Sequence, residues 1–168
     1  MDSGKRTMKI RIIFAVAVVL NAALIFFLSA QNGEKSAETS GLLIERLFGD
    51  LFTKLGINLG DIAVFAAIDH IIRKLAHFSE YALLGINLSV FIFTFDKKIP
   101  FTAICTVTSS FLYACTDEFH QYFVPARSAQ FTDVLIDTLG AAAGAAAFVL
   151  ITMIKKRIEQ NRIKTRQQ

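Results

Sequence analysis

The segment "KLAHFSEYALLG" (residues 74–85) places ionisable side chains at the start of an otherwise apolar stretch. Lys74, His77 and Glu80 are three residues apart, and Tyr81 follows Glu80. At 100° per residue, these four side chains occupy one helix face about 120° wide. An ionisable group inside a membrane segment is costly unless it has a partner or a function. The spacing therefore predicts a functional or ion-paired cluster on this face.

A second polar group lies in "TDEFHQYFVPAR", at the end of another apolar stretch. Asp117, His120 and Gln121 recur at spacings of three and four, so a helix would present them on one face, with Glu118 about 100° to the side. The proline of this segment is expected to end the helix. Arg127 then follows in a short loop.

A third group opens the last apolar stretch. Asp133 and Asp137 are one helical turn apart, and Gly140 and Gly144 continue the same face. Small residues in a pattern such as "GAAAG" let a neighbouring helix backbone approach closely. The two carboxylates are therefore expected to point into the tightly packed interior of the bundle.

These residue types are compatible with catalysis. A histidine held by a neighbouring carboxylate could act as a general base, with a glutamate as its acid partner. The candidates for such roles are His77, Glu80, Glu118 and His120. The same set could hold a divalent metal ion. However, the sequence contains no established ligand-spacing motif such as H-E-x-x-H, and no evident serine or cysteine nucleophile stands beside a histidine.

Binding of an amphiphilic headgroup is the interpretation that best explains the outer location of these residues. Lys74 and Arg127 could pair with phosphate, while the acids contact an amine or a sugar. The candidate ligand-binding residues are Lys74, His77, Glu80, Tyr81, Asp117, Glu118, His120, Gln121, Arg127, Asp133 and Asp137. A purely structural ion-pair network is the bland alternative, but buried charge pairs stabilise poorly. A transporter would need ionisable residues deeper in the membrane. It is less favoured because the halves of the apolar stretches that lie away from these polar groups hold almost no ionisable residues.

Four apolar stretches must position these residues, at about 10–30, 75–95, 100–123 and 131–154. Each is long enough for a hydrocarbon core, which requires about 20 residues. The chain is 54% hydrophobic and has a mean hydropathy of +0.49, which excludes an ordinary soluble domain. We expect an all-α membrane protein: a four-transmembrane-helix bundle forming a single domain over residues 1–168.

The positive charges predict the topology. Lysines and arginines cluster before the first stretch, between the second and third, and after the fourth. An even number of spans places all three clusters on one side, and the positive-inside rule makes that side the cytoplasm. Both termini are expected to be cytoplasmic in a bacterial plasma membrane, with the polar groups at the extracytoplasmic face. The basic tail is expected to meet anionic lipid, not nucleic acid. The first stretch could be a cleaved signal peptide, but its apolar run is longer than usual for one.

The connection between the first two spans, residues 31–73, is expected to be extracytoplasmic. Its first part, "QNGEKSAETSG", is polar and predicts an irregular loop. The next part, "LLIERLFGDLFTKL", predicts an amphipathic helix that lies at the membrane interface or caps the bundle. Asp61 and Asp69 are candidate N-caps for the helical segments that follow. The apolar residues of the amphipathic part recur every four positions, at Leu43, Leu47, Leu51 and Leu55.

Three segments closely resemble the VanZ-like family of bacterial membrane proteins: "RKLAHFSEYALLG", "DEFHQYFVPARSAQFTDVLIDTLGAAAG" and "FFLSAQNGEKSAETS". The family pattern K-x-x-H-F-x-E-Y, D-E-x-H-Q and D-x-x-x-D falls on the candidate binding residues given above. Members often show P-G-R where this chain has Pro125, Ala126 and Arg127. The family's namesake is associated with resistance to teicoplanin, a glycopeptide that attacks cell-wall precursors outside the membrane. The resemblance therefore implies a cell-envelope role, with membrane lipids or a lipid-linked cell-wall precursor as partners, and it implies no particular reaction.

Overall fold

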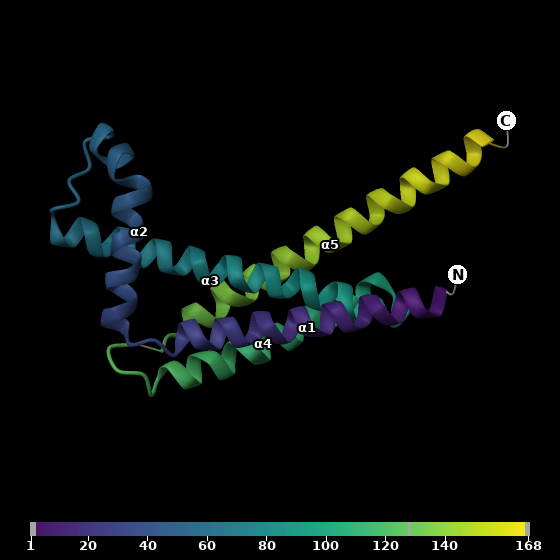
Figure 1. Cartoon of the computed structure of the whole chain (residues 1–168), viewed down its shortest axis with the longest axis horizontal. Coiled ribbons are helices and arrows are strands. Elements are labelled where there is room, and N and C mark those ends of the chain that lie inside the picture. Colours follow the sequence, from purple (N-terminus) through teal and green to yellow (C-terminus); the bar gives the residue numbers. More distant parts are fainter. Residues whose placement is uncertain (1–2, 128, 167–168) are drawn as a thin grey trace.

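The computed structural model describes residues 3–127 and 129–166, which contain five α-helices (Figure 1). They are α1 (Ser3–Ser29), α2 (Gly33–Lys54), α3 (Ile62–Phe93), α4 (Ile99–Gln121) and α5 (Phe131–Arg166). Four of them, all except α2, are long and apolar enough to cross a membrane. The predicted all-α bundle with four spanning helices is confirmed.

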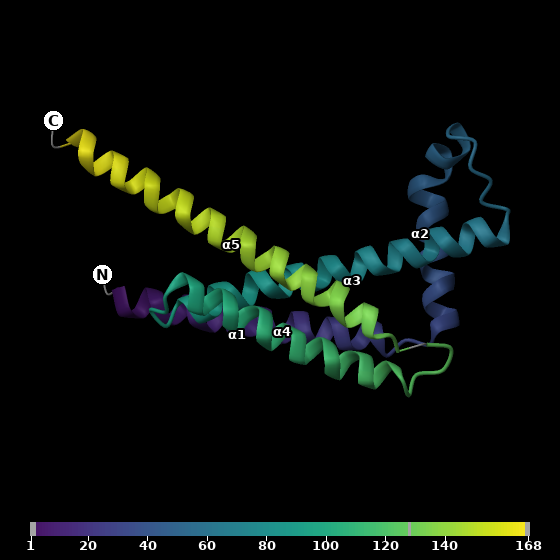
Figure 2. The ribbon, with the colours of Figure 1, turned by 180° about the vertical axis from the view of Figure 1, so that it is seen from behind.

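Helix α3 lies at the centre of the bundle and packs most extensively against α5, and also against α1, α4 and α2. Two opposite views show α1, α3 and α4 running alongside one another while α5 crosses α3 and extends beyond the bundle (Figures 1 and 2). Tyr81 and Leu84 of α3 meet Ile25, Ala114 and Ala141 in the buried core. The helices that carry the three polar groups are therefore direct neighbours.

The contact between α3 and α5 depends on glycine. A Cβ atom at Gly140 would lie 2.3 Å from the carbonyl oxygen of Phe78, and one at Gly144 would lie 2.1 Å from that of Ala82. No side chain fits at these distances, so the two backbones touch directly. This confirms the close approach predicted from "GAAAG". It also places the start of α5 beside the polar face of α3.

The two termini lie at the same end of the bundle (Figure 1). Arg11 of α1 donates from Nη2 to the carbonyl oxygen of Thr94, at 2.7 Å, and its guanidinium lies 4.4 Å from the ring centroid of Phe95. The α3–α4 turn, with Lys97 and Lys98, therefore lies beside the start of α1. We call this end, with the C-terminal part of α5, the basic end, and the opposite end, with α2 and the α4–α5 loop, the polar end.

Helix α2 corrects the prediction of an irregular loop, because Gly33 to Gly41 of that segment are helical. Two contacts stabilise this first part of α2. The backbone N–H of Gly33 donates to the carbonyl oxygen of Pro125, at 3.2 Å, and the Ser40 hydroxyl donates to the carboxylate of Asp69. Long-range partners thus outweigh the loop preference of a glycine- and serine-containing segment.

Helix α2 crosses the polar end of the bundle, and its amphipathic second half extends beyond α3 (Figure 1). It packs against α3, and Ile44 is fully buried. The leucines at the four-residue spacing are all more than half exposed: Leu43, Leu47, Leu51 and Leu55. An exposed apolar stripe fits a helix that lies on a membrane surface better than a cap that buries its leucines over the bundle.

Asp61 is the N-cap of α3, as predicted, and its carboxylate accepts from the N–H groups of Ala63 and Val64. The same prediction for Asp69 is wrong. Asp69 lies inside α3, is 4% exposed and forms a 2.8 Å ion pair with Arg73. Helix α3 thus begins well before the predicted span at Leu75, because Asp61 caps one continuous helix.

The other predicted spans agree with the helices to within a few residues, except at the ends near the basic clusters. Helix α1 begins at Ser3 and α5 continues to Arg166. At 1.5 Å per residue, the 32 residues of α3 extend about 48 Å and the 36 of α5 about 54 Å. Both exceed a hydrocarbon core of about 30 Å. The first turns of α3 and the last turns of α5 therefore extend past the core.

Candidate functional site

A half-open cavity of about 150 Å³ lies at the polar end, between α3, α4, α5 and the α4–α5 loop. Seven of the predicted site residues line it: Lys74, His77, Glu118, Gln121, Arg127, Asp133 and Asp137. Five further lining residues were not among the predicted ones: His70, Arg73, Ala126, Gln130 and Ile136. The structure thus brings residues that are far apart in the sequence around one space.

Two of the basic residues in this region already have acidic partners. Lys74 of α3 forms an ion pair with Asp133 at the start of α5. Arg73 pairs with Asp69 one turn earlier in α3. The Lys74–Asp133 pair links α3 to α5, and the Arg73–Asp69 pair lies within α3. Neither cation is therefore paired with the acids of α4 or with Asp137.

Arg127 has a different environment. Its Nε and Nη2 donate to the carbonyl oxygens of Gln31 and Leu28, at 3.3 and 3.2 Å, at the end of α1. Burial lowers the pKa of this guanidinium, and the nearby charge of Arg73 lowers it further, while Asp117 raises it. A guanidinium stays protonated in proteins even so. Arg127 therefore supplies a half-buried positive charge whose direct partners are neutral.

The loop that carries Arg127 has an unusual backbone. Ala126 has φ 58°, in the left-handed region that favours glycine. The glycine that family members often have at this position would adopt it without strain. Ala126 adopts this backbone conformation here, and Arg127 lines the cavity.

Among the described residues, the acids in and beside the cavity accept hydrogen bonds from neutral groups only, or from no group. Oδ2 of Asp117 accepts from the Ser29 hydroxyl at 2.8 Å and from Nε2 of Gln121 at 3.3 Å. Glu118 accepts from the backbone N–H of Gln130 at 3.0 Å. Asp137 is 1% exposed, and neither of its carboxylate oxygens has a hydrogen-bond partner among the described residues.

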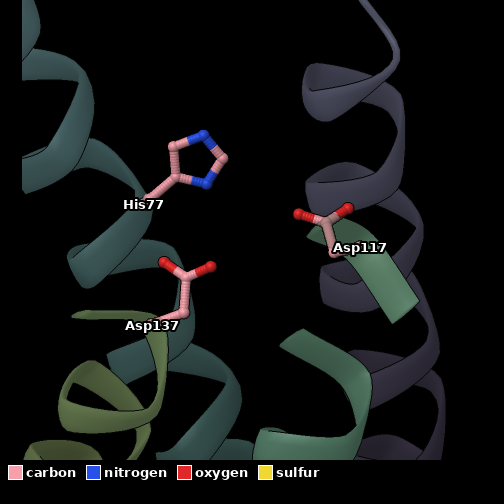
Figure 3. A group of neighbouring side chains, drawn as sticks. All are labelled: His77, Asp117 and Asp137. Carbon is pink, nitrogen blue, oxygen red and sulfur yellow. The ribbon is translucent and has the colours of Figure 1, made fainter. Parts of the chain in front are cut away.

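Three of these side chains converge, one from each of three helices. His77 of α3, Asp117 of α4 and Asp137 of α5 each offer one donor atom, and these atoms all lie within 4.8 Å of one another. Figure 3 shows an imidazole nitrogen of His77 turned toward the two carboxylates. Glu80 lies beside this group, with Oε2 at 4.0 Å from Nδ1 of His77. We call His77, Asp117 and Asp137 the inner triad.

Four predicted residues do not line the cavity: Glu80, Tyr81, Asp117 and His120. Glu80 and Asp117 lie beside His77, whereas the other two lie elsewhere. Tyr81 is fully buried in the core, and its ring lies 6.1 Å from that of Tyr113. His120 stacks on Phe26 of α1, with ring centroids 4.5 Å apart, and does not line the cavity. Of the four catalytic candidates, His77 and Glu118 line the cavity and Glu80 only adjoins His77.

Ser29 and His70 are two of the residues in or beside the site that the sequence-based prediction missed. Ser29, fully buried, is the last residue of α1 and holds Asp117. A hydroxyl at the end of an apolar span was its only signal. His70 lies one turn before Lys74, so it would have joined the same helix face if the helix had been extended past the predicted start of the span.

A bundle of four apolar helices enclosing a cavity lined by ionisable residues defines a multi-pass membrane protein with a polar site near one end. Within that class, the chain belongs to the VanZ/LLP1 family, whose sequence model matches residues 14–152. This range contains every residue of the cavity and of the inner triad, and it confirms the resemblance seen in the sequence. Neither a curated protein nor a solved structure matches the chain.

Proposed function

We propose that this VanZ-like protein binds the phosphate-bearing headgroup of an amphiphile in the polar-end cavity. The observation that carries the proposal is Arg127, a half-buried cation that lines the cavity. Among the described residues, its side chain donates to carbonyl groups only. A guanidinium can form two parallel hydrogen bonds to a phosphate. Lys74 and His70 lie on the same cavity wall and extend its donor surface.

The dimensions of the cavity favour a headgroup over a whole lipid. Pockets for drug-sized ligands have volumes of about 300–1,000 Å³, whereas this one has about 150 Å³. A phosphate with part of a sugar or amine fits such a space. The apolar chains of the amphiphile would remain outside, against the exposed apolar side chains of the spanning helices.

The location of the cavity supports a cell-envelope ligand. The positive-inside rule places the basic end, and both termini, in the cytoplasm of a bacterium. The cavity then opens near the extracytoplasmic face of the plasma membrane, where lipid-linked cell-wall precursors are displayed. The family's namesake is associated with resistance to teicoplanin, and teicoplanin acts on those precursors. The proposed ligand therefore links the chain to that resistance.

Binding can be tested with farnesyl phosphate and farnesol, which differ only in the phosphate. The purified protein in nanodiscs is expected to bind the phosphate more tightly, as measured by microscale thermophoresis. Because a hydrogen bond to a charged group contributes about 1.5–3 kcal/mol, Arg127→Gln should weaken binding by at least about tenfold. Arg162→Gln, on the exposed end of α5, is the matched control and should bind normally. Equal binding of phosphate and alcohol would contradict the proposal.

A membrane-embedded enzyme that acts on a lipid-linked substrate is the second candidate, favoured by the position of His77 beside buried carboxylates. Such a histidine could accept a proton from an attacking water. In that case His77→Gln should abolish turnover of a lipid-linked substrate and leave farnesyl phosphate binding within about threefold. Unchanged turnover in this variant would exclude His77 as the base.

A further inference from the structure

The inner triad combines an imidazole with two buried carboxylates, each from a different helix. We infer that His77, Asp117 and Asp137 together bind one divalent transition-metal ion at the inner wall of the cavity. This goes beyond headgroup binding and does not rest on it, because the ion would bind without any lipid.

The spacing suits a single ion. Metal–nitrogen and metal–oxygen bonds to such an ion are about 2.0–2.4 Å long, so two ligands on opposite sides of it lie about 4–5 Å apart. The three donor atoms of the triad lie within 4.8 Å of one another. Figure 3 shows the three side chains around one space, with His77 and Asp137 on one side of it and Asp117 on the other.

Burial supplies an independent observation. Asp137 is 1% exposed and Asp117 is 3% exposed. Both oxygens of Asp137, Oδ1 of Asp117 and Nδ1 of His77 have no hydrogen-bond partner among the described residues. A buried carboxylate without a partner is costly. Unpartnered polar atoms on each of the three neighbouring side chains indicate a ligand that satisfies them together.

The charges point to a cation. Within the described residues, no lysine or arginine forms an ion pair with Asp117 or Asp137. Lys74 pairs with Asp133 instead, and Arg127 donates to carbonyl groups. Two close carboxylates in a low-dielectric interior disfavour each other's ionised form unless a positive charge lies nearby. An ion of charge +2 would offset both of them.

The surroundings hold the donors in place. Ser29 and Gln121 donate to Oδ2 of Asp117, which leaves its Oδ1 available. Hydrogen-bonded neighbours of this kind orient metal ligands and tune their affinity. The direct α3–α5 backbone contact at Gly140 fixes His77 relative to Asp137. Donors on three packed helices form a more rigid site than donors on loops.

One imidazole and two carboxylates favour a transition metal such as Mn²⁺ or Zn²⁺ over Mg²⁺ or Ca²⁺, which prefer oxygen ligands alone. Three protein ligands also leave coordination positions open to water or to an oxygen of a bound molecule. The site is therefore of the kind that holds a resident ion facing a cavity.

The test measures Mn²⁺ binding to the purified protein in detergent without added lipid. Electron paramagnetic resonance detects the bound Mn²⁺. The wild-type protein is expected to bind one Mn²⁺, and Zn²⁺ should displace it, as the usual affinity order of divalent metals requires. Asp137→Asn should weaken Mn²⁺ binding at least about 100-fold, because it removes a ligand of the ion. Losing a residue that only hydrogen-bonds to a metal ligand typically weakens binding about 10–100-fold. Asp50→Asn, on the exposed surface of α2, is the control and should bind Mn²⁺ normally. Absence of stoichiometric binding, or equal loss in both variants, would overturn the assignment.

A spectroscopic measurement keeps the inference testable if Asp137→Asn does not fold. Electron spin echo modulation of the wild-type Mn²⁺ complex should show coupling to one imidazole nitrogen, and His77→Gln should remove it. Bound Mn²⁺ without nitrogen coupling would overturn the assignment of His77. Failure of farnesyl phosphate binding with Mn²⁺ binding intact would contradict the proposed function alone, and the reverse result would contradict the metal site alone.

Discussion

Asp133 and Asp137 lie one turn apart on α5 but have opposite environments. Asp133 is about a quarter exposed and pairs with Lys74, whereas Asp137 is buried and has no hydrogen-bond partner among the described residues. Their shared helix face was predictable from the spacing alone. Their different roles could not be predicted from the spacing, because these roles depend on which residue of α3 faces each carboxylate. At this scale, the outer acid holds helices together and the inner acid faces the triad.

The Lys74–Asp133 pair gives a stability prediction. Asp133→Asn removes the charged partner of a Lys74 side chain that is 24% exposed. We expect a loss of about 1–2 kcal/mol in the free energy of unfolding, below the about 3–5 kcal/mol typical of breaking a fully buried pair. Denaturant unfolding in detergent measures this loss, and a Lys74→Met, Asp133→Asn double-mutant cycle isolates the pair.

Glu80→Gln is the matched comparison for that change. Glu80 forms no hydrogen bond in the described structure and lies 4.0 Å from Nδ1 of His77. Neutralising it is expected to change the free energy of unfolding by less than about 0.5 kcal/mol, as for substitutions that remove no specific partner. If Glu80→Gln unfolds the protein while Asp133→Asn has no effect, these two assignments are wrong.

Several site residues were predictable because ionisable side chains in apolar helices are conspicuous. His120 shows where this reasoning fails. Its spacing places it near the face of Asp117 and Gln121, yet it turns toward Phe26 of α1. A helix face about 120° wide can contact two neighbouring helices. The geometry of one helix does not show which neighbour a given side chain contacts. Ser29 was missed for the converse reason, since a lone hydroxyl carries little signal until its partner is known.

At the scale of helices, Gly140 links packing to the site. Gly140→Ala would place a methyl group 2.3 Å from the carbonyl oxygen of Phe78. We expect a loss of about 1–3 kcal/mol in the free energy of unfolding, as for other overpacked interiors. Because α3 must shift relative to α5, the affinity for Mn²⁺ should fall as well.

Gly49→Ala, on α2, is the matched control for Gly140→Ala. The nearest neighbouring atom to a Cβ at Gly49 is Cγ of Glu45, at 4.0 Å, so a methyl group fits. Alanine in an open helical position is expected to raise stability by up to about 1 kcal/mol. Both variants can be compared by unfolding in the same detergent. Equal effects at the two sites would show that the α3–α5 contact is looser than described.

The four spans and their order could be predicted from the sequence because length and hydropathy decide them. The first turns of α2 could not. "QNGEKSAETSG" has the composition of a loop, and its helix depends on Gly33 meeting Pro125 and Ser40 meeting Asp69. Asp69 was misassigned as an N-cap for the same reason: its partner Ser40 lies far away in the sequence. Local signals predict where helices can form, and long-range partners decide where they begin.

Considered as a whole, the molecule has a strong asymmetry between its two ends. Arg11 and the Lys97–Lys98 turn lie at the basic end, and α5 carries Lys155, Lys156 and Arg157 past the bundle toward the same end. The cavity, the inner triad and α2 lie at the other end. A bilayer around the four apolar helices would therefore separate a basic surface from a polar site, which is the arrangement that a fixed orientation in the membrane requires.

The orientation gives the last prediction. Positive residues near short loops are retained in the cytoplasm, so alkaline phosphatase fused after Gln168 should be inactive in a bacterium, and green fluorescent protein fused there should fluoresce. Alkaline phosphatase inserted after Gly60, in the exposed α2–α3 turn, should be active, because that turn lies at the polar end. Comparable amounts of each fusion on an immunoblot provide the control. The opposite pattern would place the cavity in the cytoplasm, where exported cell-wall precursors are absent, and would overturn the proposed ligand while leaving the metal site untouched.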